Sequence, residues 1–498
     1  MTDQPASIGQ EVEQEAQFGI IPVLPHERVW GFGDFTWVNV GLAIATWAFL
    51  IGGSMASFVN LREGIAAAVI GNVIAVALMA LSTCVPSGKY GLEQYTLARS
   101  ILGRHGVKII VFVWLVAIEF GWANVLSVMF GRSSTHVVNE LAHTSFGYSS
   151  LVVTAFAVLA IVISWLILAK GPVSIKWFNT IVAPGLFIIQ IVMVILILHE
   201  KSWGQLTAIA PLEPFGNRLL DFTIAVEFNL AAGFSWWNVM GSLARVTKTK
   251  RAAFWPNMIG LFAAAVIGEI VGLMSALALG SSDPTVWMIP IGGVALGVVA
   301  LVWIAFANMT SIVSIIYSTC LALKQVGGAA FAKVSWGTLT GLFFVGPAIL
   351  TIWPGLIYDH FFQFLLWSGV AYAPLSGIWI IDYFILRRQW LDLRAIYETG
   401  RDKPYAFWRG WNPAGLIALG AGSISYIIFL NPASLNHIAA FKYTTASLPS
   451  FAIGAAVYWI LTEVWVKRAG KGGYDRRPVG SVSPMAAVGA ETGSTPEH

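Results

Sequence analysis

Long apolar segments recur along the whole chain, separated by short polar or basic gaps. A hydrocarbon layer about 30 Å thick is crossed by roughly 20 apolar residues in a helix. Segments of this kind lie near residues 35–58, 64–85, 107–131, 150–169, 175–198, 220–240, 254–279, 294–323, 336–353, 360–386, 412–430 and 448–466. The pattern therefore predicts an all-α integral membrane protein with 12 transmembrane helices.

Positive charge falls into alternate gaps between these segments. If the N-terminus is cytoplasmic, the inner gaps hold 24 of the 29 lysines and arginines, and the outer gaps hold five. Because positively charged loops stay on the cytoplasmic side, residues 245–251 and 387–409 are expected inside. Residues 132–149 and 199–218 are expected outside. The prediction is a multi-pass protein of the plasma membrane with both termini cytoplasmic.

The composition agrees with a membrane protein and weakens other classes. Hydrophobic residues make up 57% of the chain and charged residues 11%, and the mean hydropathy is +0.73. The net charge of +4 is explained by inner loops that face anionic lipid, so it does not indicate nucleic-acid binding. Cys84 and Cys320 fall in predicted spans and are expected to be packing residues. The histidines lie in loops or at span ends without metal-ligand spacing, which argues against a membrane enzyme.

Two of the predicted spans contain interruptions. The first carries small residues at 41–46 and 52–54, and the sixth carries a similar run at 229–235. Interrupted helices five spans apart are typical of transporters with inverted repeats, whose binding site lies at the midplane. The alternative is ordinary close packing between helices through small residues.

These patterns divide the chain into six parts. The predicted parts are a mobile cytoplasmic tail (1–30), a first inverted repeat (31–200), a second (201–388), a cytoplasmic linker (389–411), two further spans (412–466) and a disordered cytoplasmic tail (467–498).

A cluster of hydroxyls lies in the middle of the eighth span. Thr310 and Ser311 follow Ala307 by one helical turn, and carbonyls of Gly41 and Ile44 in the interrupted first span could complete a shell of hard oxygen ligands. The alternative is that both hydroxyls bond to carbonyls of their own helix.

The third span places a carboxyl and an aromatic ring on one helix face. Glu119, Trp122 and Leu126 are spaced i, i+3, i+7. A carboxyl at this depth costs at least ~2.5 kcal/mol, so Glu119 needs a partner inside the bundle, and Trp122 could offer a flat face to a planar ligand. The alternatives are a structural partner for Glu119 and packing against lipid or other helices for Trp122. Glu227 and Glu269 also place carboxyls inside predicted spans, so each of them, like Glu119, has either a structural partner or a functional role.

Three aromatic residues follow the interruption in the sixth span. They are Phe234, Trp236 and Trp237. Adjacent residues point to different faces of a helix, so at most one of the two tryptophans can line a central cavity.

Residues 374–384 read P-L-S-G-I-W-I-I-D-Y-F, followed by Arg387 and Arg388, and residues 405–412 read Y-A-F-W-R-G-W-N. These motifs closely resemble those of the nucleobase–cation symporter family, especially its bacterial hydantoin and allantoin transporters. The resemblance implies the leucine-transporter fold, with two inverted five-helix repeats and two additional C-terminal helices.

The resemblance also implies two sites. The substrate would lie between Trp122 and an aromatic of the sixth helix, for which Phe234 and Trp236 are both candidates. The implied sodium ligands are Gly41, Ile44, Ala307, Thr310 and Ser311.

Three positions depart from the hydantoin transporter. This chain has Ala45, Leu126 and Ile316 where the resemblance implies side-chain amides. The absence of these amides weakens the case for hydantoin itself, and other polar groups are expected to take over the hydrogen bonding. The candidates are Thr46, Glu119, Asn124, Asn308 and Ser314.

The predicted function is a secondary active transporter that imports a purine, pyrimidine, hydantoin or allantoin-like heterocycle by cation symport and alternating access. The coupling ion is sodium, with a proton as the alternative, and we expect a monomer without a further cofactor. The rival is a proton-coupled carrier of the same fold for an amino acid, vitamin or other small solute, with Glu119 or Glu227 as the coupling group. A channel is less compatible with interrupted helices and an aromatic pair, which suit an occluding site.

Overall fold

The computed structural model describes residues 22–44, 46–169, 172–398, 400 and 402–474. Within these ranges the chain forms helices, loops and three isolated β-bridges, without an extended strand. Each of the twelve predicted ranges contains helix, so the prediction of an all-α protein is confirmed.

The elements of the first half follow the predicted order. They are η1 (Pro25–Glu27), α2 (Phe32–Ala43), α3 (Thr46–Met55), α4 (Leu61–Met79), η2 (Ala80–Cys84), α5 (Val85–Tyr90), α6 (Gln94–Leu97), α7 (Arg99–Ile109), η3 (Ile110–Leu115), α8 (Val116–Ala142), α9 (Leu151–Ala169), α10 (Pro172–Glu200) and α11 (Trp203–Ala208).

The second half continues in the same way. Its elements are α12 (Arg218–Ser235), α13 (Trp237–Ala244), α14 (Lys250–Pro256), η4 (Asn257–Phe262), α15 (Ala263–Leu279), η5 (Pro284–Val286), α16 (Met288–Gly327), α17 (Ala329–Ala332), α18 (Trp336–Leu350), α19 (Gly355–Tyr358), α20 (Phe361–Ile380), η6 (Ile381–Leu386), α21 (Leu393–Tyr397), η7 (Pro404–Ala406), α22 (Pro413–Phe429), α23 (Phe441–Thr444), α24 (Ser447–Leu461) and η8 (Thr462–Val466).

Length and composition identify the helices that can cross a bilayer. Among the described residues, seven helices are long and apolar enough, and the bent pair α2 and α3 makes an eighth candidate. Three shorter apolar helices are Pro184–Glu200, Trp336–Leu350 and Pro413–Phe429. The number of crossings, twelve, stays a prediction.

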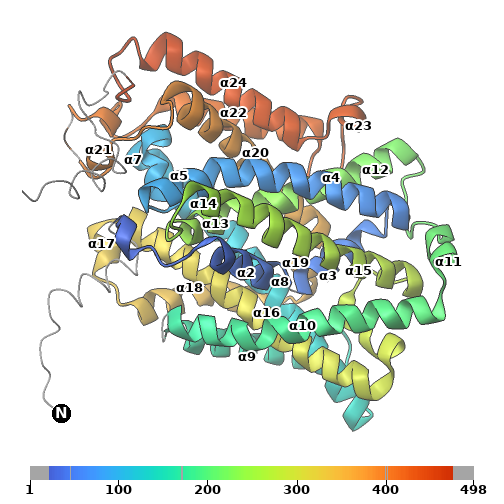
Figure 1. Ribbon diagram of the computed structural model, residues 1–498. Helices are drawn as coiled ribbons and strands as arrows, with labels where there is room; N and C mark the ends of the chain where they lie inside the picture. The colour runs from blue at the N-terminus through green and yellow to red at the C-terminus, as the bar shows by residue number, and fades with distance from the viewer. Residues whose placement is uncertain (1–21, 45, 170–171, 399, 401, 475–498) are drawn as a thin grey trace, which may run out of the picture.

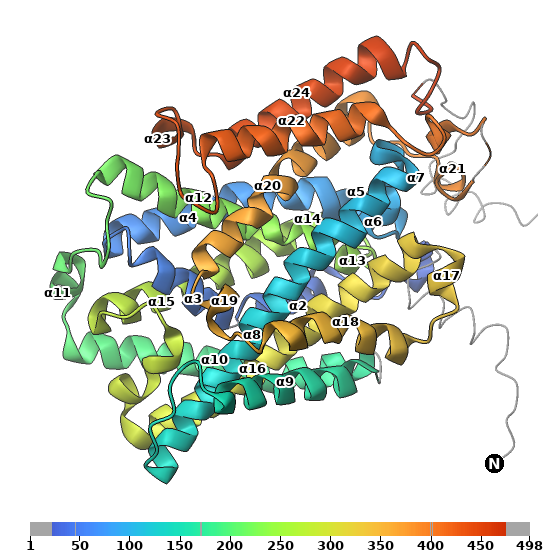
Figure 2. The ribbon, with the colours of Figure 1, turned by 180° about the vertical axis from the view of Figure 1, so that it is seen from behind.

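The helices form one bundle with two distinct sides (Figures 1 and 2). Helices α22 and α24 pack against each other and against α20 along one side, while α9, α10 and α18 lie on the opposite side. Between them, α3 packs against α15, α4 against α12, and α8 against α16. This interior is where the interrupted helices meet.

Two glycines allow α3 and α15 to approach closely. A Cβ atom at Gly52 would collide with the backbone of Glu269, and one at Gly272 would collide with the backbone of Phe49. Small residues at such contacts are typical of helix packing in membranes, where van der Waals contact drives association. The interrupted first helix is thereby held against α15.

The outer faces of the bundle are apolar. Leu166 on α9, Ile188 on α10 and Leu342 on α18 are 51%, 60% and 65% exposed. Such faces suit the hydrocarbon layer, in which exposed apolar side chains cost nothing.

The predicted break at residues 41–46 of the first span is confirmed, whereas the interruption predicted at 52–54 is wrong, because these residues are helical within α3. Helix α2 ends at Ala43, Ile44 has non-helical angles (φ −77°, ψ 77°), and the axes of α2 and α3 differ by 56°.

The predicted break within residues 229–235 is wrong. These residues are helical, and α12 is interrupted only at Trp236, the turn before α13. The small residues have a packing role, because a Cβ atom at Gly233 would collide with Ala75 of α4. In this segment the alternative of close helix packing applies.

Part of the predicted mobile tail, residues 22–30, is docked on the bundle. Arg28 donates to the carbonyls of Gly88 (2.6 Å) and Lys89 (2.9 Å). The Trp30 carbonyl accepts from the Lys248 amide (2.9 Å). Residues 1–21, and residues 475–498 of the C-terminal tail, lie outside the described part of the chain.

Candidate functional site

A pocket lies where α3, α8, α16 and the junction of α12 and α13 meet. Its walls are mainly apolar and aromatic, which is typical of small-molecule sites. The lining residues are Trp47, Ile51, Trp122, Leu126, Ala232, Ser235, Trp236, Asn238, Val239 and Ile315.

Trp122 is held in place by two phenylalanines. Its ring meets those of Phe361 and Phe364 edge to face, with centroids 5.6 and 5.8 Å away. Gly121 makes room for this arrangement, because a Cβ atom there would collide with the Phe364 ring. The Trp122 side chain is therefore oriented by its neighbours at the wall of the pocket.

The aromatics at the α12–α13 junction separate into three environments. Trp236 lines the pocket and meets Trp47 edge to face at 5.4 Å. Phe234 is fully buried and does not line the pocket. Trp237 is also fully buried, stacked on Tyr372 at 5.7 Å and edge-on to Tyr95 at 5.3 Å. Of the two sixth-helix candidates, the structure brings Trp236 into the same pocket as Trp122.

The polar candidates lie around the pocket but do not line it. The Thr46 hydroxyl donates to the amide oxygen of Asn308, which links α3 to α16. Asn124 is fully buried, and both polar atoms of its amide are without a hydrogen-bond partner among the described residues. Ser314 donates to the carbonyl of Thr310 at 2.8 Å. Ala45 lies outside the described residues.

The carboxyl of Glu119 reaches the pocket through a residue that sequence reasoning missed. Asn238 lines the pocket, and its Nδ2 donates to Glu119 Oε1. Both side chains are buried. The sequence showed Asn238 only as a neighbour of the tryptophan pair, and nothing in it indicated a contact with Glu119, which is 119 positions earlier in the chain.

The implied cation ligands come from two parts of the fold: Gly41 and Ile44 lie at the end of α2, and Ala307, Thr310 and Ser311 lie in α16. Thr310 Oγ1 donates to the carbonyl of Ala307 at 2.7 Å, as the intrahelical alternative predicts. The hydroxyl oxygen still carries lone pairs for a cation. Ile44 is buried at the break, and Gly41 and Ser311 are half-buried. Carbonyl and hydroxyl oxygens are ligands of hard cations, so the chemistry of the set fits sodium.

Glu227 has a structural partner. It accepts hydrogen bonds from the amides of Ala446 (2.8 Å) and Ser447 (2.9 Å) and from the Ser447 hydroxyl (2.6 Å). These donors lie at the start of α24, so this carboxyl anchors α24 to α12.

Glu269 lies in a second amide cluster. Asn72 Nδ2 donates to Glu269 Oε2 at 2.8 Å and to Asn229 Oδ1 at 3.0 Å. This cluster joins α4, α12 and α15 away from the lining residues of the pocket.

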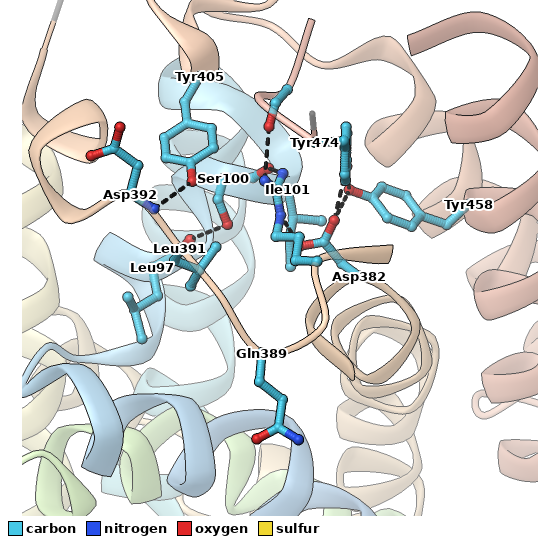
Figure 3. Close-up of polar contacts among 12 residues, drawn as sticks. Leu97, Ser100, Ile101, Asp382, Gln389, Leu391, Asp392, Tyr405, Tyr458 and Tyr474 are labelled. Carbon is cyan, nitrogen blue, oxygen red and sulfur yellow. Dashed lines mark hydrogen bonds and ion pairs between the residues drawn. The ribbon is translucent and has the colours of Figure 1, made fainter. Parts of the chain in front are cut away.

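The P-L-S-G-I-W-I-I-D-Y-F segment ends in a buried ion pair (Figure 3). Arg387 Nε donates to Asp382 Oδ2 at 2.6 Å, and both side chains are almost completely buried. We call this group the Asp382 network; its other members are the carbonyls of Ser100 and Gly472, which accept from Arg387 (both 2.8 Å), and the hydroxyls of Tyr458 and Tyr474, which donate to Asp382 Oδ1 (2.9 and 2.8 Å).

The cysteines and acidic residues do not form a metal centre in the described ranges. Cys84 and Cys320 are free and buried, in agreement with a packing role. The described residues hold no group of three or more His, Cys, Asp or Glu side chains that could bind a metal.

Comparison with solved structures shows the fold. The inward-facing conformation of Mhp1 superposes with a TM-score of 0.76 over 92% of this chain and 97% of Mhp1, at 18% identity. Mhp1 in a closed conformation with bromovinylhydantoin bound, described as a nucleobase–cation symport transporter, gives 0.73 over 89% and 95%, at 18% identity.

Sequence relatives cover most of the chain. A purine-uracil permease of Arabidopsis thaliana is 24% identical over 88% of this chain and 76% of its own length. A hydantoin permease of Microbacterium maritypicum is 24% identical over 82% and 85%. A cytosine permease of Escherichia coli K12 is 23% identical over 76% and 84%.

A family model described as "Permease for cytosine/purines, uracil, thiamine, allantoin" matches residues 22–455. The match includes both predicted repeats and both interrupted helices. Together with the apolar helices, it shows that the chain is a multi-pass membrane protein that belongs to the nucleobase–cation symporter family of permeases.

Proposed function

We propose that this permease imports a nucleobase or a related planar heterocycle by cation symport and alternating access. The observation that carries the proposal is a pocket lined by both Trp122 and Trp236, and by Trp47 and Ile51 of α3, the helix that follows the break. Relatives named for purine, uracil, cytosine and hydantoin support a planar ring as the substrate class.

The aromatic walls suit a flat ligand. A ring between Trp122 and Trp236 would gain about 0.5–1.5 kcal/mol from each offset stack, beyond the burial of its area. Trp47 and the two phenylalanines behind Trp122 hold the walls in place through edge-to-face contacts. The cost of ordering these side chains is therefore met before the substrate arrives.

The break in the first helix connects the proposed cation ligands to the pocket. Ile44 lies at the break, while Trp47 and Ile51 of the following helix line the pocket. A sodium ion held by Gly41, Ile44, Ala307, Thr310 and Ser311 would order the break and so position the α3 side chains. Occupancy of either site then raises the affinity of the other by the same factor.

A proton-coupled carrier of the same fold is the second candidate. Glu119 favours it, because its carboxyl bonds directly to the pocket residue Asn238. Glu227 is a weaker candidate for coupling, since the start of α24 already supplies three donors to its carboxyl.

Thermal-shift and uptake measurements test the proposal. We expect uracil, hydantoin, xanthine, cytosine or allantoin to stabilise the purified protein, and sodium to strengthen the effect. A ligand at 100 times its dissociation constant stabilises by ~2.7 kcal/mol. Uptake into proteoliposomes that follows a sodium gradient supports sodium symport, while uptake that follows only a pH gradient supports the second candidate. A stable protein that binds none of these compounds would contradict the proposed substrate class.

The proposed orientation has its own test. Single cysteines placed in loop 245–251, in a background free of Cys84 and Cys320, should resist an impermeant reagent applied from outside. Cysteines in 199–218 should react. Labelling of loop 245–251 from outside would reverse the topology.

A further inference from the structure

Within the described part of the chain, one buried polar atom of the pocket wall has no hydrogen-bond partner. Among the ten lining residues, Asn238 alone has a buried side-chain polar atom, its Oδ1, without a hydrogen bond. The side chain is 3% exposed. By contrast, Ser235 donates to the carbonyl of Ala232 at 2.6 Å, and the Trp47 ring nitrogen donates to the carbonyl of Leu42 at 3.3 Å.

The other end of the Asn238 amide is fixed by Glu119. Asn238 Nδ2 donates to Glu119 Oε1, and the second oxygen of that carboxyl is buried without a partner. In this bond the Glu119 carboxyl oxygen is the acceptor and the NH₂ group of Asn238 is the donor. Glu119 therefore keeps the NH₂ end of the amide turned toward α8, and the carbonyl oxygen of Asn238 turned away from it.

Asn238 is the one carboxamide among the lining residues. Leu126 and Ile315 are apolar walls of the same pocket. A buried acceptor without a partner is unfavourable, and at a cavity wall a bound molecule can supply the missing donor. The donor that Asn238 Oδ1 requires is an N–H or O–H group at the edge of the ligand.

We propose that Asn238 Oδ1 accepts a hydrogen bond from a ring N–H of the substrate, and that Glu119 is the positioning residue that orients this amide. The selected class is lactam-type heterocycles with a free N–H, and their N-methylated derivatives are rejected. This inference rests on the proposed function, because it assigns a hydrogen-bonding edge to the ring that the tryptophans stack on.

Matched pairs of ligands test the inference. The probes are uracil against 1,3-dimethyluracil, hydantoin against 1,3-dimethylhydantoin, and xanthine against caffeine. Each second member lacks the ring N–H donors of the first. Isothermal titration of the full-length protein gives the ratio of dissociation constants for each pair. We expect the wild type to prefer the N–H member of at least one pair by about 10- to 100-fold, the range for a buried polar group left unpaired.

Two variants test the role of Asn238 as the acceptor and the role of Glu119 as the positioning residue. Asn238→Leu keeps the branched shape of the side chain but removes the acceptor, so the preference should fall to within about 3-fold, whereas a steric origin would leave it intact. Glu119→Gln can donate to Asn238 Oδ1 and so release the amide from its single orientation. It should reduce the preference while the stacked ring still binds. Asn39→Leu is the matched control, since Asn39 is a buried asparagine outside the pocket lining.

The outcomes distinguish a failure of the proposed function from a failure of the inference about Asn238. If the folded wild type binds no N–H member, the proposed function is overturned and this inference falls with it. If the wild type binds them but does not prefer them, or if Asn238→Leu and Glu119→Gln keep the wild-type ratio, only the inference is overturned. If Asn238→Leu does not fold, Glu119→Gln decides alone. If a variant loses affinity for both members of a pair while the ratio of their dissociation constants is unchanged, the substituted residue has a purely structural role, and the inference is also overturned.

Discussion

Two buried carboxyls of this permease are used in opposite ways. Asp382 receives three donors, one from Arg387 and two from tyrosine hydroxyls, so both of its oxygens are occupied (Figure 3). From the residues that the structure describes, Glu119 receives one donor, Asn238, and its second oxygen receives none. Both side chains are at most 1% exposed.

This difference in hydrogen bonding distinguishes a structural network around Asp382 from a candidate binding site around Glu119. A fully satisfied polar network rigidifies the elements that it joins, here the end of α20 and η6, α7 and the segment around Gly472. An incomplete pair at a pocket wall instead leaves hydrogen-bonding capacity for a ligand. The completeness of the hydrogen bonds, and not burial alone, distinguishes the two regions.

Breaking the Asp382 network should have the largest effect. Arg387→Met leaves the Asp382 charge buried without its cation and removes the donors to two carbonyls, so we expect a loss of about 3–5 kcal/mol of stability. The apparent melting temperature of the purified protein measures it. Arg388→Met, at the exposed neighbouring position, is the control and should change stability by less than ~0.5 kcal/mol. Equal melting temperatures for the two variants would contradict the structural role.

Truncating the pocket wall should affect binding more than stability. We expect Trp122→Ala to lose roughly 2–4 kcal/mol of substrate binding, or about 30- to 1000-fold. Trp122→Phe keeps a ring and should lose much less. Titration of equal folded amounts with the tightest compound of the thermal-shift screen measures the loss, and an unchanged affinity in Trp122→Ala would refute the stacking assignment.

The sixth-helix aromatics sharpen this test. Trp236→Ala should reproduce the binding defect of Trp122→Ala, because both rings line the pocket. Phe234→Ala empties a fully buried position, so it should lower the melting temperature without a selective loss of binding. A selective loss of binding in Phe234→Ala, and not in Trp236→Ala, would indicate that the substrate contacts the face of α12 that carries Phe234.

Removing the proposed cation ligands should abolish the response to sodium. In Thr310→Ala/Ser311→Ala too few oxygens remain for a hard cation, so the stabilisation of ~2.7 kcal/mol expected at 100 times the dissociation constant should disappear. Thr319→Ala is the control, because Thr319 is a buried hydroxyl further along α16 that bonds to the carbonyl of Ile315. If the double variant still responds to sodium, the cation binds elsewhere.

Removing one hydroxyl from the Asp382 network should have the smallest effect. Burial raises the pKa of Tyr474 above its ordinary value, so its hydroxyl stays a donor at physiological pH. Tyr474→Phe leaves Arg387 and Tyr458 in place, and we expect a loss of about 1–2 kcal/mol. Melting curves of this variant should fall between those of the wild type and Arg387→Met. A loss as large as that of Arg387→Met would mean that the whole network depends on this one donor.

The helical architecture, the interrupted first helix and the family were predictable from the sequence. Hydrophobic runs are local, and a span of about 20 apolar residues has no stable alternative to helix inside lipid. The motifs at 374–388 and 405–412 resemble the family through contiguous residues, so they are also visible without a structure. The break in the sixth helix was less predictable, because small residues serve close packing as readily as interruption.

The contents of the pocket were decided by tertiary structure. The sequence by itself determined that Glu119 and Trp122 share one face of a helix, and that only one of Trp236 and Trp237 can reach a cavity. It could not determine that Asn238 bonds to Glu119, that Trp236 and not Phe234 lines the pocket, or that Glu227 anchors α24. Helical periodicity specifies which residues share a face, whereas the rotation of each helix in the bundle, set by packing against its neighbours, specifies what that face meets.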